Sequence, residues 1–530
     1  MIGGIQPAVL GDAIPPNVPH TIVCSLPTWQ DMMGFVEGEE RVTTALKAGY
    51  YRQKIHDYVK ALWKICYQIH GVEGEECVLY VKKHAENPGE PRVCRFEIPY
   101  KSGVDVSEFP EVFAVFFPSS ALTEASQFMM YTGSGISARF AEQCLECIPE
   151  ELIDTSTFII PLKTVNWRDQ EYYKVHRPIE SGPEAKSALR RLFAGDLGDG
   201  LANIRGVPGV SPDDVYLYAS GMNAIWHLHL MILDTRPKGL KSAAFNVMYS
   251  HSHNLIEGWG AGHYVIGSGS IADLEARLAS EQAKDPERPP LAALYIDFPT
   301  NPMLQSPDVA RLRELADRYH VPLIIDETVG NLINVQLLPY ADIVVCSFTK
   351  IISGLANDTY HGEDAIRLEA NTRGVKQGIA IVDKNAEAVA DYLYAWSQKP
   401  QGSFIKQVLY PTYQTRDIYE RYLNKDSRTR PGYGGLLSIS FTSLAIAKVF
   451  YDALPCYKGI TFGTIFTLAV PFTEMSFHSK LQWAEENGVE HALIRITIGM
   501  EDWESLKDGF DVALAAAEDV AKLNEDPVEQ

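Results

Sequence analysis

The chain has 530 residues, and its 68 acidic and 47 basic side chains leave a net charge of −21. An excess of carboxylates repels phosphate backbones, so non-specific binding to nucleic acid is not expected. Hydrophobic residues make up 46% of the chain and charged residues 22%, a balance that excludes a disordered protein. The length predicts about two to four domains.

Membrane insertion and export are not predicted. No window reaches the roughly 20 consecutive apolar residues that a membrane span needs, and residues 1–9 lack the basic and apolar segments of a signal peptide. We therefore expect a cytoplasmic location. Eight cysteines in a chain of this length form no disulfide framework. Cys144 and Cys147 form the one Cys-x-x-Cys pair, and without further ligands nearby we expect buried thiols rather than a zinc site.

The first part of the chain has an irregular pattern. Residues 41–69 are predicted to be helical, and residues 77–82 and 112–117 have the apolar composition of strands. We assign residues 1–165 to an N-terminal extension. A charged helix is then predicted over residues 184–194.

From about residue 213 the pattern becomes regular. Short apolar runs alternate with amphipathic helices, which predicts an α/β fold with a mostly parallel sheet covered on both faces. We assign residues 166–384 to this large domain. The predicted strands are 215–218, 242–248, 291–298, 322–326 and 343–346, and the predicted helices are 223–233, 271–282 and 309–319.

After about residue 385 the order of elements changes. A helix over 385–396 is followed by apolar strands over 434–441 and 493–498, and by a last helix over 503–523. This order predicts a second, smaller α+β domain, to which we assign residues 385–530.

Parallel sheets bind ligands at the carboxyl ends of their strands. Ser220, Gly221 and Met222 lie between a predicted strand and a predicted helix. A glycine there lets the backbone approach an anion, and the free N–H groups of the helix start point toward it. The segment is therefore a candidate phosphate site, with a plain strand-to-helix turn as the alternative.

Two further strand ends carry charged residues. Asp326 closes the strand 322–326, and a buried carboxylate there is costly unless a cation meets it. The alternative is a helix cap or a surface salt bridge. Lys350 follows the strand 343–346 and is flanked by Ser347 and Thr349. Partial desolvation lowers the pKa of a lysine and frees its amine for Schiff-base chemistry, whereas a solvated loop lysine has no such role.

Together the three strand ends favour pyridoxal phosphate. This cofactor needs a lysine, a carboxylate on its ring nitrogen and a phosphate cradle. Other cofactor signals are weak. The glycines of residues 258–262 have the wrong spacing for a nicotinamide site. His251 and His253 have no third ligand in view, so we expect no metal and interpret them as polar neighbours of a pocket.

Three segments then indicate a family: Pro299-Thr-Asn-Pro302, Asp326-Glu-Thr-Val-Gly330 and Ser347-Phe-Thr-Lys350. They resemble the cystathionine γ-synthase group of the Cys/Met-metabolism enzymes that use pyridoxal phosphate. Residues 19–29, 34–38 and 493–501 resemble the fungal branch of that group, and the likeness extends over about residues 19–515. The resemblance implies the fold of the type I pyridoxal-phosphate transferases.

The resemblance also implies roles. Lys350 would hold the cofactor covalently and move protons, and Tyr249 would stack on its ring and assist proton transfer. Arg495 would bind the substrate's α-carboxylate as a bidentate pair. Asn301 and Thr328 would flank the 3-hydroxyl of the ring. Asn301 and Thr467 would complete the substrate site. The remaining cofactor-binding residues would be Ser220, Gly221, Met222, Tyr173, Asp326, Thr328, Ser347 and Thr349.

The sequence departs from the family at three places. Val175, in Tyr173-Lys174-Val175, stands where the family has an arginine that reaches the phosphate of a neighbouring subunit. Lys174 or Arg177 is left as a replacement. Residues 49–53 and 355–361 also differ. These departures leave the expected cofactor intact and the second substrate open.

The reaction implied is γ-replacement on an O-acyl-L-homoserine. A thiol nucleophile would form a Cγ–S bond as in trans-sulfuration, and a β-keto acid would form a Cγ–C bond in specialised metabolism. One alternative is a C–S lyase acting on cystathionine or methionine. Another is a non-catalytic subunit, which the presence of Lys350 disfavours. The resemblance also implies a homodimer or homotetramer with shared active sites.

Overall fold

The structure is a computed structural model. It describes residues 9–525 except 17–19, 50–53, 81–91, 105–108, 154–180, 199, 201, 268, 355–361, 403 and 427. Tyr173, Val175 and the segment 355–361 therefore lie outside the described residues. In the part of the chain that is described, no helix has the length and apolar character needed to span a membrane.

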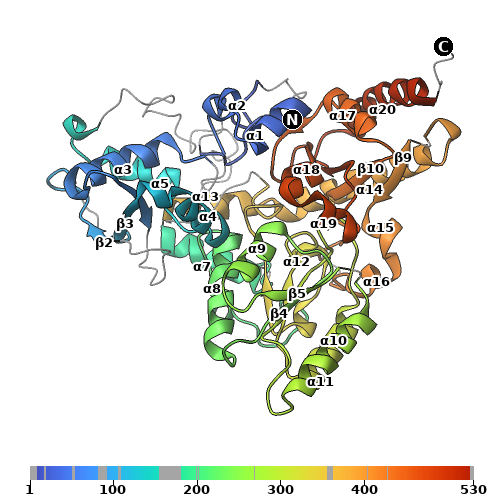
Figure 1. Ribbon diagram of the computed structural model, residues 1–530, viewed down its shortest axis with the longest axis horizontal. Helices are drawn as coiled ribbons and strands as arrows, with labels where there is room; N and C mark the ends of the chain where they lie inside the picture. Colours follow the sequence, from blue (N-terminus) through green and yellow to red (C-terminus); the bar gives the residue numbers. More distant parts are fainter. Residues whose placement is uncertain are drawn as a thin grey trace.

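A five-stranded parallel sheet lies in the part of the molecule that is lowest in Figure 1, beside α10 (Ile271–Lys284) and α11 (Val309–Tyr319). Its strands lie side by side in the order β5 (His263–Ile266), β4 (Ser242–Phe245), β6 (Leu294–Asp297), β7 (Leu323–Asp326) and β8 (Ile343–Val345). The helices that connect and cover them are α8 (Gly221–Thr235), α9 (Ser250–Gly258), α10, α11 and the short α12 (Asn331–Asn334). This arrangement confirms the predicted α/β class.

Alternate side chains of β4 explain why the sheet reads as continuous apolar runs. Ala243 and Phe245 pack with Leu274 of α10 and Leu312 of α11. Ala244, between them, packs in the core formed with α8 and α9. Because both faces are covered, every position of β4 is buried.

The C-terminal part contains a second sheet. Its order is β11 (Tyr457–Lys458), β12 (Leu468–Pro471), β13 (Leu493–Thr497), β10 (Leu436–Phe441) and β9 (Ile405–Leu409), antiparallel except for β11 and β12. Apolar residues of three helices pack on it. These helices are α14 (Val375–Ser397), α17 (Leu444–Ala453) and α20 (Trp503–Glu525). The short helices α15 (Pro411–Gln414), α16 (Arg416–Arg421), α18 (Phe472–Phe477) and α19 (Leu481–Glu486) complete this part.

The N-terminal residues pack against two different places. Cys24, Leu26 and Met32 share a core with Val470 and Leu493 of the C-terminal sheet. Farther along, a three-stranded antiparallel sheet and three helices share a core with α8. The helices that follow Leu26 are α1 (Trp29–Val36) and α2 (Glu40–Ala45); the later unit comprises β1 (Glu75–Tyr80), β2 (Arg92–Phe96), β3 (Val112–Pro118), α3 (Asp57–His70), α4 (Leu122–Thr132) and α5 (Ala138–Glu146).

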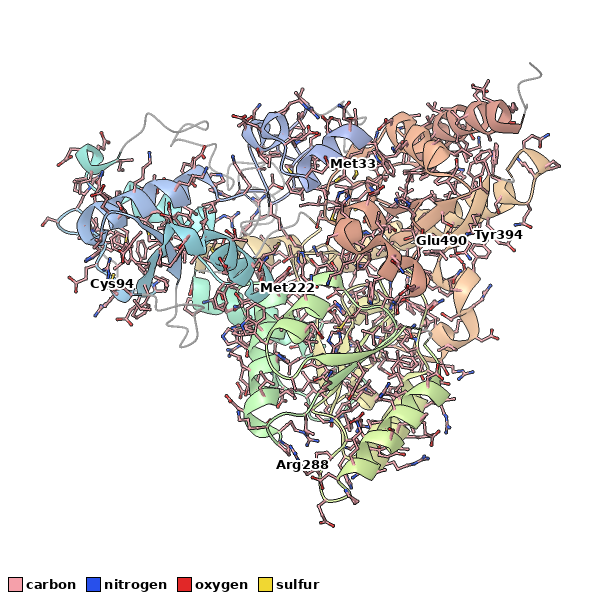
Figure 2. The ribbon with its side chains drawn as sticks, viewed as in Figure 1. Met33, Cys94, Met222, Arg288, Tyr394 and Glu490 are labelled. Carbon is pink, nitrogen blue, oxygen red and sulfur yellow. The ribbon has the colours of Figure 1, made fainter. Side chains whose placement is uncertain are left out.

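Figure 2 shows how the N-terminal and C-terminal parts lie relative to helix α8. Met222 of α8 lies near the middle of the molecule, with Cys94 of the N-terminal sheet and Tyr394 of α14 toward opposite sides. The helices α7 (Gly182–Phe193) and α13 (Gly362–Thr372) pack on one another and complete the described elements. The domain boundaries at 165 and 384 stay predictions.

Three sequence predictions need correction. The helix predicted over 41–69 is two helices, because the chain becomes extended at Leu46, whose side chain is buried in the core that Cys24 and Leu26 share with the C-terminal sheet. Residues 215–218 form no strand in the sheet, and Tyr216 is 75% exposed. The helix predicted from 385 begins at Val375, since buried residues at 375, 379 and 382 extend its apolar face by helical spacing.

Candidate active site

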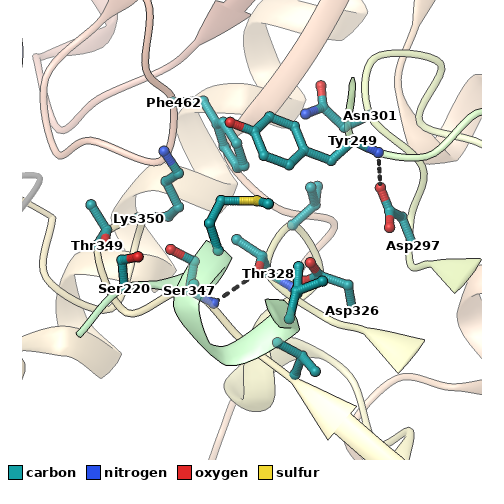
Figure 3. A pocket seen from close by; sticks show the side chains of 15 residues that line it. Ser220, Tyr249, Asp297, Asn301, Asp326, Thr328, Ser347, Thr349, Lys350 and Phe462 are labelled. Atoms are coloured by element: carbon teal, nitrogen blue, oxygen red, sulfur yellow. Dashed lines mark hydrogen bonds between the residues drawn. The ribbon is translucent and has the colours of Figure 1, made fainter. Parts of the chain in front are cut away.

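A pocket of about 590 Å³, including the part open to solvent, lies at the carboxyl ends of β6, β7 and β8 beside the start of α8 (Figure 3). The sequence analysis placed the chemistry at these strand ends. Ten of its candidate residues line the pocket: Ser220, Gly221, Met222, Tyr249, Asn301, Asp326, Thr328, Ser347, Thr349 and Lys350.

The start of α8 has the form of an anion cradle. Ser220 is the N-cap, and its Oγ accepts a hydrogen bond from the backbone N–H of Asn223 at 3.2 Å. A Cβ on Gly221 would lie 2.7 Å from the Cβ of Ser347, so only glycine lets the helix start approach the loop after β8 so closely. The backbone N–H groups that begin this 15-residue helix thus lie beside the Ser347 hydroxyl, as phosphate binding requires.

The N-terminal part shapes this cradle from outside. Gly133 has φ +62°, and a Cβ there would lie 2.4 Å from Ser220 Oγ. The side-chain amide of Asn223 donates to the backbone oxygen of Thr132 at 3.1 Å. Sequence analysis gave no signal for these contacts, because the residues they join are about 90 positions apart.

Asp326 ends β7 with its carboxyl group in the pocket. Burial raises the pKa of this carboxyl, while hydrogen bonds from Thr328 and the positive charge of Lys350 act in the opposite direction. One oxygen, Oδ1, accepts the backbone N–H of Thr328 at 2.9 Å. The Thr328 hydroxyl accepts the backbone N–H of Ser347 at 2.8 Å, which ties the ends of β7 and β8 together. A buried carboxyl in this position fits the ring nitrogen of pyridoxal phosphate.

Lys350 reaches the pocket from the loop after β8. Its Nζ donates to the Oγ1 of Thr461 at 3.1 Å and lies 4.9 Å from the centroid of the Phe462 ring. Figure 3 shows the lysine and the phenylalanine on the same side of the pocket. Two residues of the C-terminal part, Thr461 and Phe462, therefore fix the position of the Lys350 amine in the pocket.

Tyr249 precedes α9 and is fixed by its backbone. Its N–H donates to the Oδ2 of Asp297 at 2.8 Å, and its hydroxyl lies 3.1 Å from the Nδ1 of His251. The His251 ring is thus a polar neighbour of the pocket, as expected. His253 instead contacts His263, with 2.8 Å between the Nδ1 of the first and the Nε2 of the second. The described residues include no group of His, Cys, Asp and Glu suited to a metal ion.

Arg495 lies just behind the pocket wall. It is 2% exposed at the middle of β13. One nitrogen, Nη1, donates to the Oδ1 of Asn301 at 3.1 Å, and the other, Nη2, donates to the backbone oxygen of Thr461 at 3.1 Å. The guanidinium carbon lies 4.6 Å from the ring centroid of Phe472. Arg495 itself does not line the pocket, but Asn301, to which it donates, does.

Thr467, the remaining predicted substrate residue, does not line this pocket. Its hydroxyl donates to the Oε2 of Glu501 at 2.9 Å, and its backbone N–H donates to the Oε1 of the same residue at 2.6 Å. Its role in substrate binding stays a prediction.

Sequence reasoning missed several residues of the site. Asp297 closes β6 as Asp326 closes β7, so the signal that found the second also applied to the first. Thr461 and Phe462 carry no such signal, because they come from a loop of the C-terminal part that only tertiary packing brings to Lys350. Ile225, Val329 and Val345 add apolar walls.

Residues 201–363 match the family described as "Cys/Met metabolism PLP-dependent enzyme", and residues 58–137 match the "Fungal trans-sulfuration enzyme, N-terminal domain". The second match covers all three strands of the small N-terminal sheet, helix α4 and nearly all of helix α3.

Relatives that match over nearly their whole length bear names from the same family. The chain is 36% identical to the cystathionine gamma-synthase-like enzyme iboG1 of Amanita muscaria, with 96% of this chain and 97% of the relative covered. It is 30% identical to cystathionine gamma-synthase of Neurospora crassa, with 97% and 99% covered. It is also 27% identical to the alanine racemase ungC of Aspergillus violaceofuscus, with 97% of each covered. Enzymes named for different reactions thus occur among its relatives.

These findings confirm the predicted family, the type I fold and the cofactor. One pocket brings together a lysine (Lys350), a carboxylate (Asp326) and a helix start at Gly221, which are the kinds of group that pyridoxal phosphate needs. The chain belongs to the Cys/Met metabolism family of pyridoxal-phosphate enzymes, and it is a cystathionine gamma-synthase-like member of that family.

Proposed function

We propose that the enzyme replaces the γ-substituent of an O-acyl-L-homoserine by a thiol or a carbon nucleophile. The Cγ–O bond breaks and the carboxylate leaves with the bonding electrons. A Cγ–S or Cγ–C bond forms, and the nucleophile loses its proton. The observation that carries the proposal is the chain of contacts from Arg495 through Thr461 to Lys350, which sets a carboxylate-binding cation beside the amine that moves protons.

Each residue has a part in this reaction. Bound pyridoxal phosphate supplies an electron sink that lets protons leave carbons of the substrate. The amine of Lys350 would take and return these protons, assisted by the Tyr249 hydroxyl in the same pocket. Asp326 would balance positive charge on the ring nitrogen of the bound cofactor. Arg495 and Asn301 hold the α-carboxylate and so fix which carbon lies near Lys350.

Two observations support an amino-acid substrate of this kind. The Amanita and Neurospora relatives bear cystathionine gamma-synthase names over nearly their full lengths. Phe462, whose ring centroid lies 4.9 Å from the Nζ of Lys350, and Val329 give the pocket apolar walls, which would keep water away from a reactive intermediate. The experiment below distinguishes a sulfur nucleophile from a carbon nucleophile.

The test uses purified holoenzyme with O-acetyl-L-homoserine and, in separate reactions, cysteine, sulfide, methanethiol or acetoacetate. We expect one nucleophile to give a product whose mass equals the homoserine skeleton plus that nucleophile. K350A should give none. Formation of a keto acid and ammonia without any added nucleophile would instead show the lyase reaction. If neither wild type nor K350A gives a product, the result would favour a non-catalytic subunit.

A homodimer or homotetramer with shared active sites and a cytoplasmic location stay predictions. Light scattering coupled to size-exclusion chromatography tests the first of these.

A further inference from the structure

Two carboxyl groups lie next to one another on the floor of the pocket. Asp297 is the last residue of β6 and Asp326 is the last residue of β7, and the two are paired in register on neighbouring parallel strands. Adjacent strands are about 4.8 Å apart, so their side chains at paired positions are close neighbours. Both residues line the pocket, and Asp297 is 5% exposed.

Glu327 shows how a buried acid nearby is compensated. Its Oε1 accepts a hydrogen bond from the Nη1 of Arg205 at 2.7 Å, and this pair is almost fully buried. Asp326, the neighbour before it, feels the positive charge of Lys350. Each of these two acids therefore has a cation acting on it within the described residues.

Asp297 has a different environment. The groups that act on it are the Asp326 carboxyl and the backbone N–H of Tyr249. Burial, reinforced by the neighbouring Asp326, raises the pKa of this carboxyl well above its ordinary value. Two adjacent buried carboxyls do not both ionise, and the one with less compensation keeps its proton.

Among the described residues, the Asp297 side chain makes one hydrogen bond, and its partner is the main chain of Tyr249. Its Oδ2 accepts the Tyr249 N–H at 2.8 Å, as the dashed line in Figure 3 shows. Tyr249 immediately precedes α9 and makes no side-chain cap for it. Asp297 therefore joins the end of β6 to the segment that carries the tyrosine ring into the pocket.

We propose that Asp297 is a positioning residue of the active site: a neutral carboxyl group that anchors the main chain of Tyr249 and leaves Asp326 as the one negative charge on the pocket floor. This deepens the proposed function, since it rests on the catalytic role of Tyr249. Its test is made without substrate, so it stands or falls separately from the reaction.

The test compares D297N, D297A and two matched controls, D383N and D383A. Asp383 is 6% exposed, and burial raises the pKa of its carboxyl to about 7, but it does not line the pocket. The controls therefore report what loss of a buried acid does in general. Asparagine at 297 keeps an oxygen acceptor and stays neutral, whereas alanine removes the acceptor.

The first readout is hydrogen–deuterium exchange of a peptide that contains Tyr249. Loss of the anchor in D297A should speed exchange there about tenfold, while D297N and both controls stay close to wild type. Wild-type exchange in D297A would overturn the anchoring role. If D297A fails to fold, faster exchange in D297N than in D383N would also contradict it, because the amide oxygen is expected to replace the carboxyl.

The second readout is the pH midpoint at which the absorbance of the Lys350-bound cofactor changes. A negative charge on the pocket floor would raise this midpoint, so its removal would lower it. Because Asp297 is neutral in our proposal, D297N should leave the midpoint unchanged. A midpoint lowered by about one unit or more in D297N, but not in D383N, would show that Asp297 carries a charge and would overturn the proposal.

Discussion

Gly221 is the point where α8 comes closest to the loop that carries Lys350. A Cβ added there would lie 2.7 Å from Ser347 Cβ and 2.9 Å from Ser347 Oγ. Ordinary contact begins at 3.4 Å, so Ser347 must move by about 0.7 Å in the variant G221A. The backbone N–H of Ser347 is held by Thr328, so the shift also disturbs the segment beside Asp326.

The strain has a predictable size. Overpacking of this kind costs about 1–3 kcal/mol. In the apoenzyme Ser347 can move aside, but phosphate binding requires it to return, so the cost falls on cofactor binding. We expect G221A to bind pyridoxal phosphate about 5- to 150-fold more weakly than wild type, since 1.4 kcal/mol corresponds to a factor of ten.

The assay is titration of the apoenzyme with pyridoxal phosphate, followed by absorbance. G378A is the matched control, because Gly378 lies inside α14 and an added Cβ there would meet only the Met500 sulfur at 3.8 Å. G378A should bind the cofactor as wild type does and should stabilise the helix by up to about 1 kcal/mol. Wild-type affinity in G221A, or an equal loss in G378A, would refute the cradle.

Three more predictions concern buried charges. Burial raises the pKa of Asp383 to about 7, so the stability that its neutral form contributes is lost as pH rises from about 4 through 7. D383N should remove this pH dependence of the free energy of unfolding, as measured by urea unfolding between pH 5 and 8. R205A leaves Glu327 buried without its cation and should lower the free energy of unfolding by about 3–5 kcal/mol. The double variant R205M/E327Q removes both charges and is expected to recover stability. Equal losses of stability in R205A and R205M/E327Q would contradict this account. R495K loses the fork that reaches Asn301, so the KM for the amino-acid substrate should rise at least tenfold with a smaller change in kcat, and an unchanged KM would contradict the carboxylate role.

The strand ends were the most predictable part of the molecule. Asp326 was found because a carboxylate that closes an apolar strand is costly to bury. Lys350 was found because a lysine just past a buried strand can be partly desolvated. Helices with strong periodicity were equally clear, and α11 was predicted at its observed bounds. Family resemblance was needed for Tyr249 and Arg495, since a tyrosine before a helix or an arginine within a strand does not by itself specify a chemistry.

What the sequence did not predict depends on tertiary contacts. The extended conformation of Leu46, which separates α2 from α3, follows from burial of its side chain in the core shared with the C-terminal sheet. Thr461 becomes part of the site only because β11 and β12 bring its loop to Lys350. Gly133 matters only because α4 ends against the Ser220 cap. A pattern read along the chain contains none of these pairings.

The most direct test of the account follows the nitrogen of the substrate. The holoenzyme is incubated with ¹⁵N-labelled O-acetyl-L-homoserine and the nucleophile panel, and the label is traced by mass spectrometry. Replacement at Cγ predicts that the label stays in a new amino acid that also contains the nucleophile. Release of the label as ammonium with formation of a keto acid, whatever nucleophile is present, would contradict it.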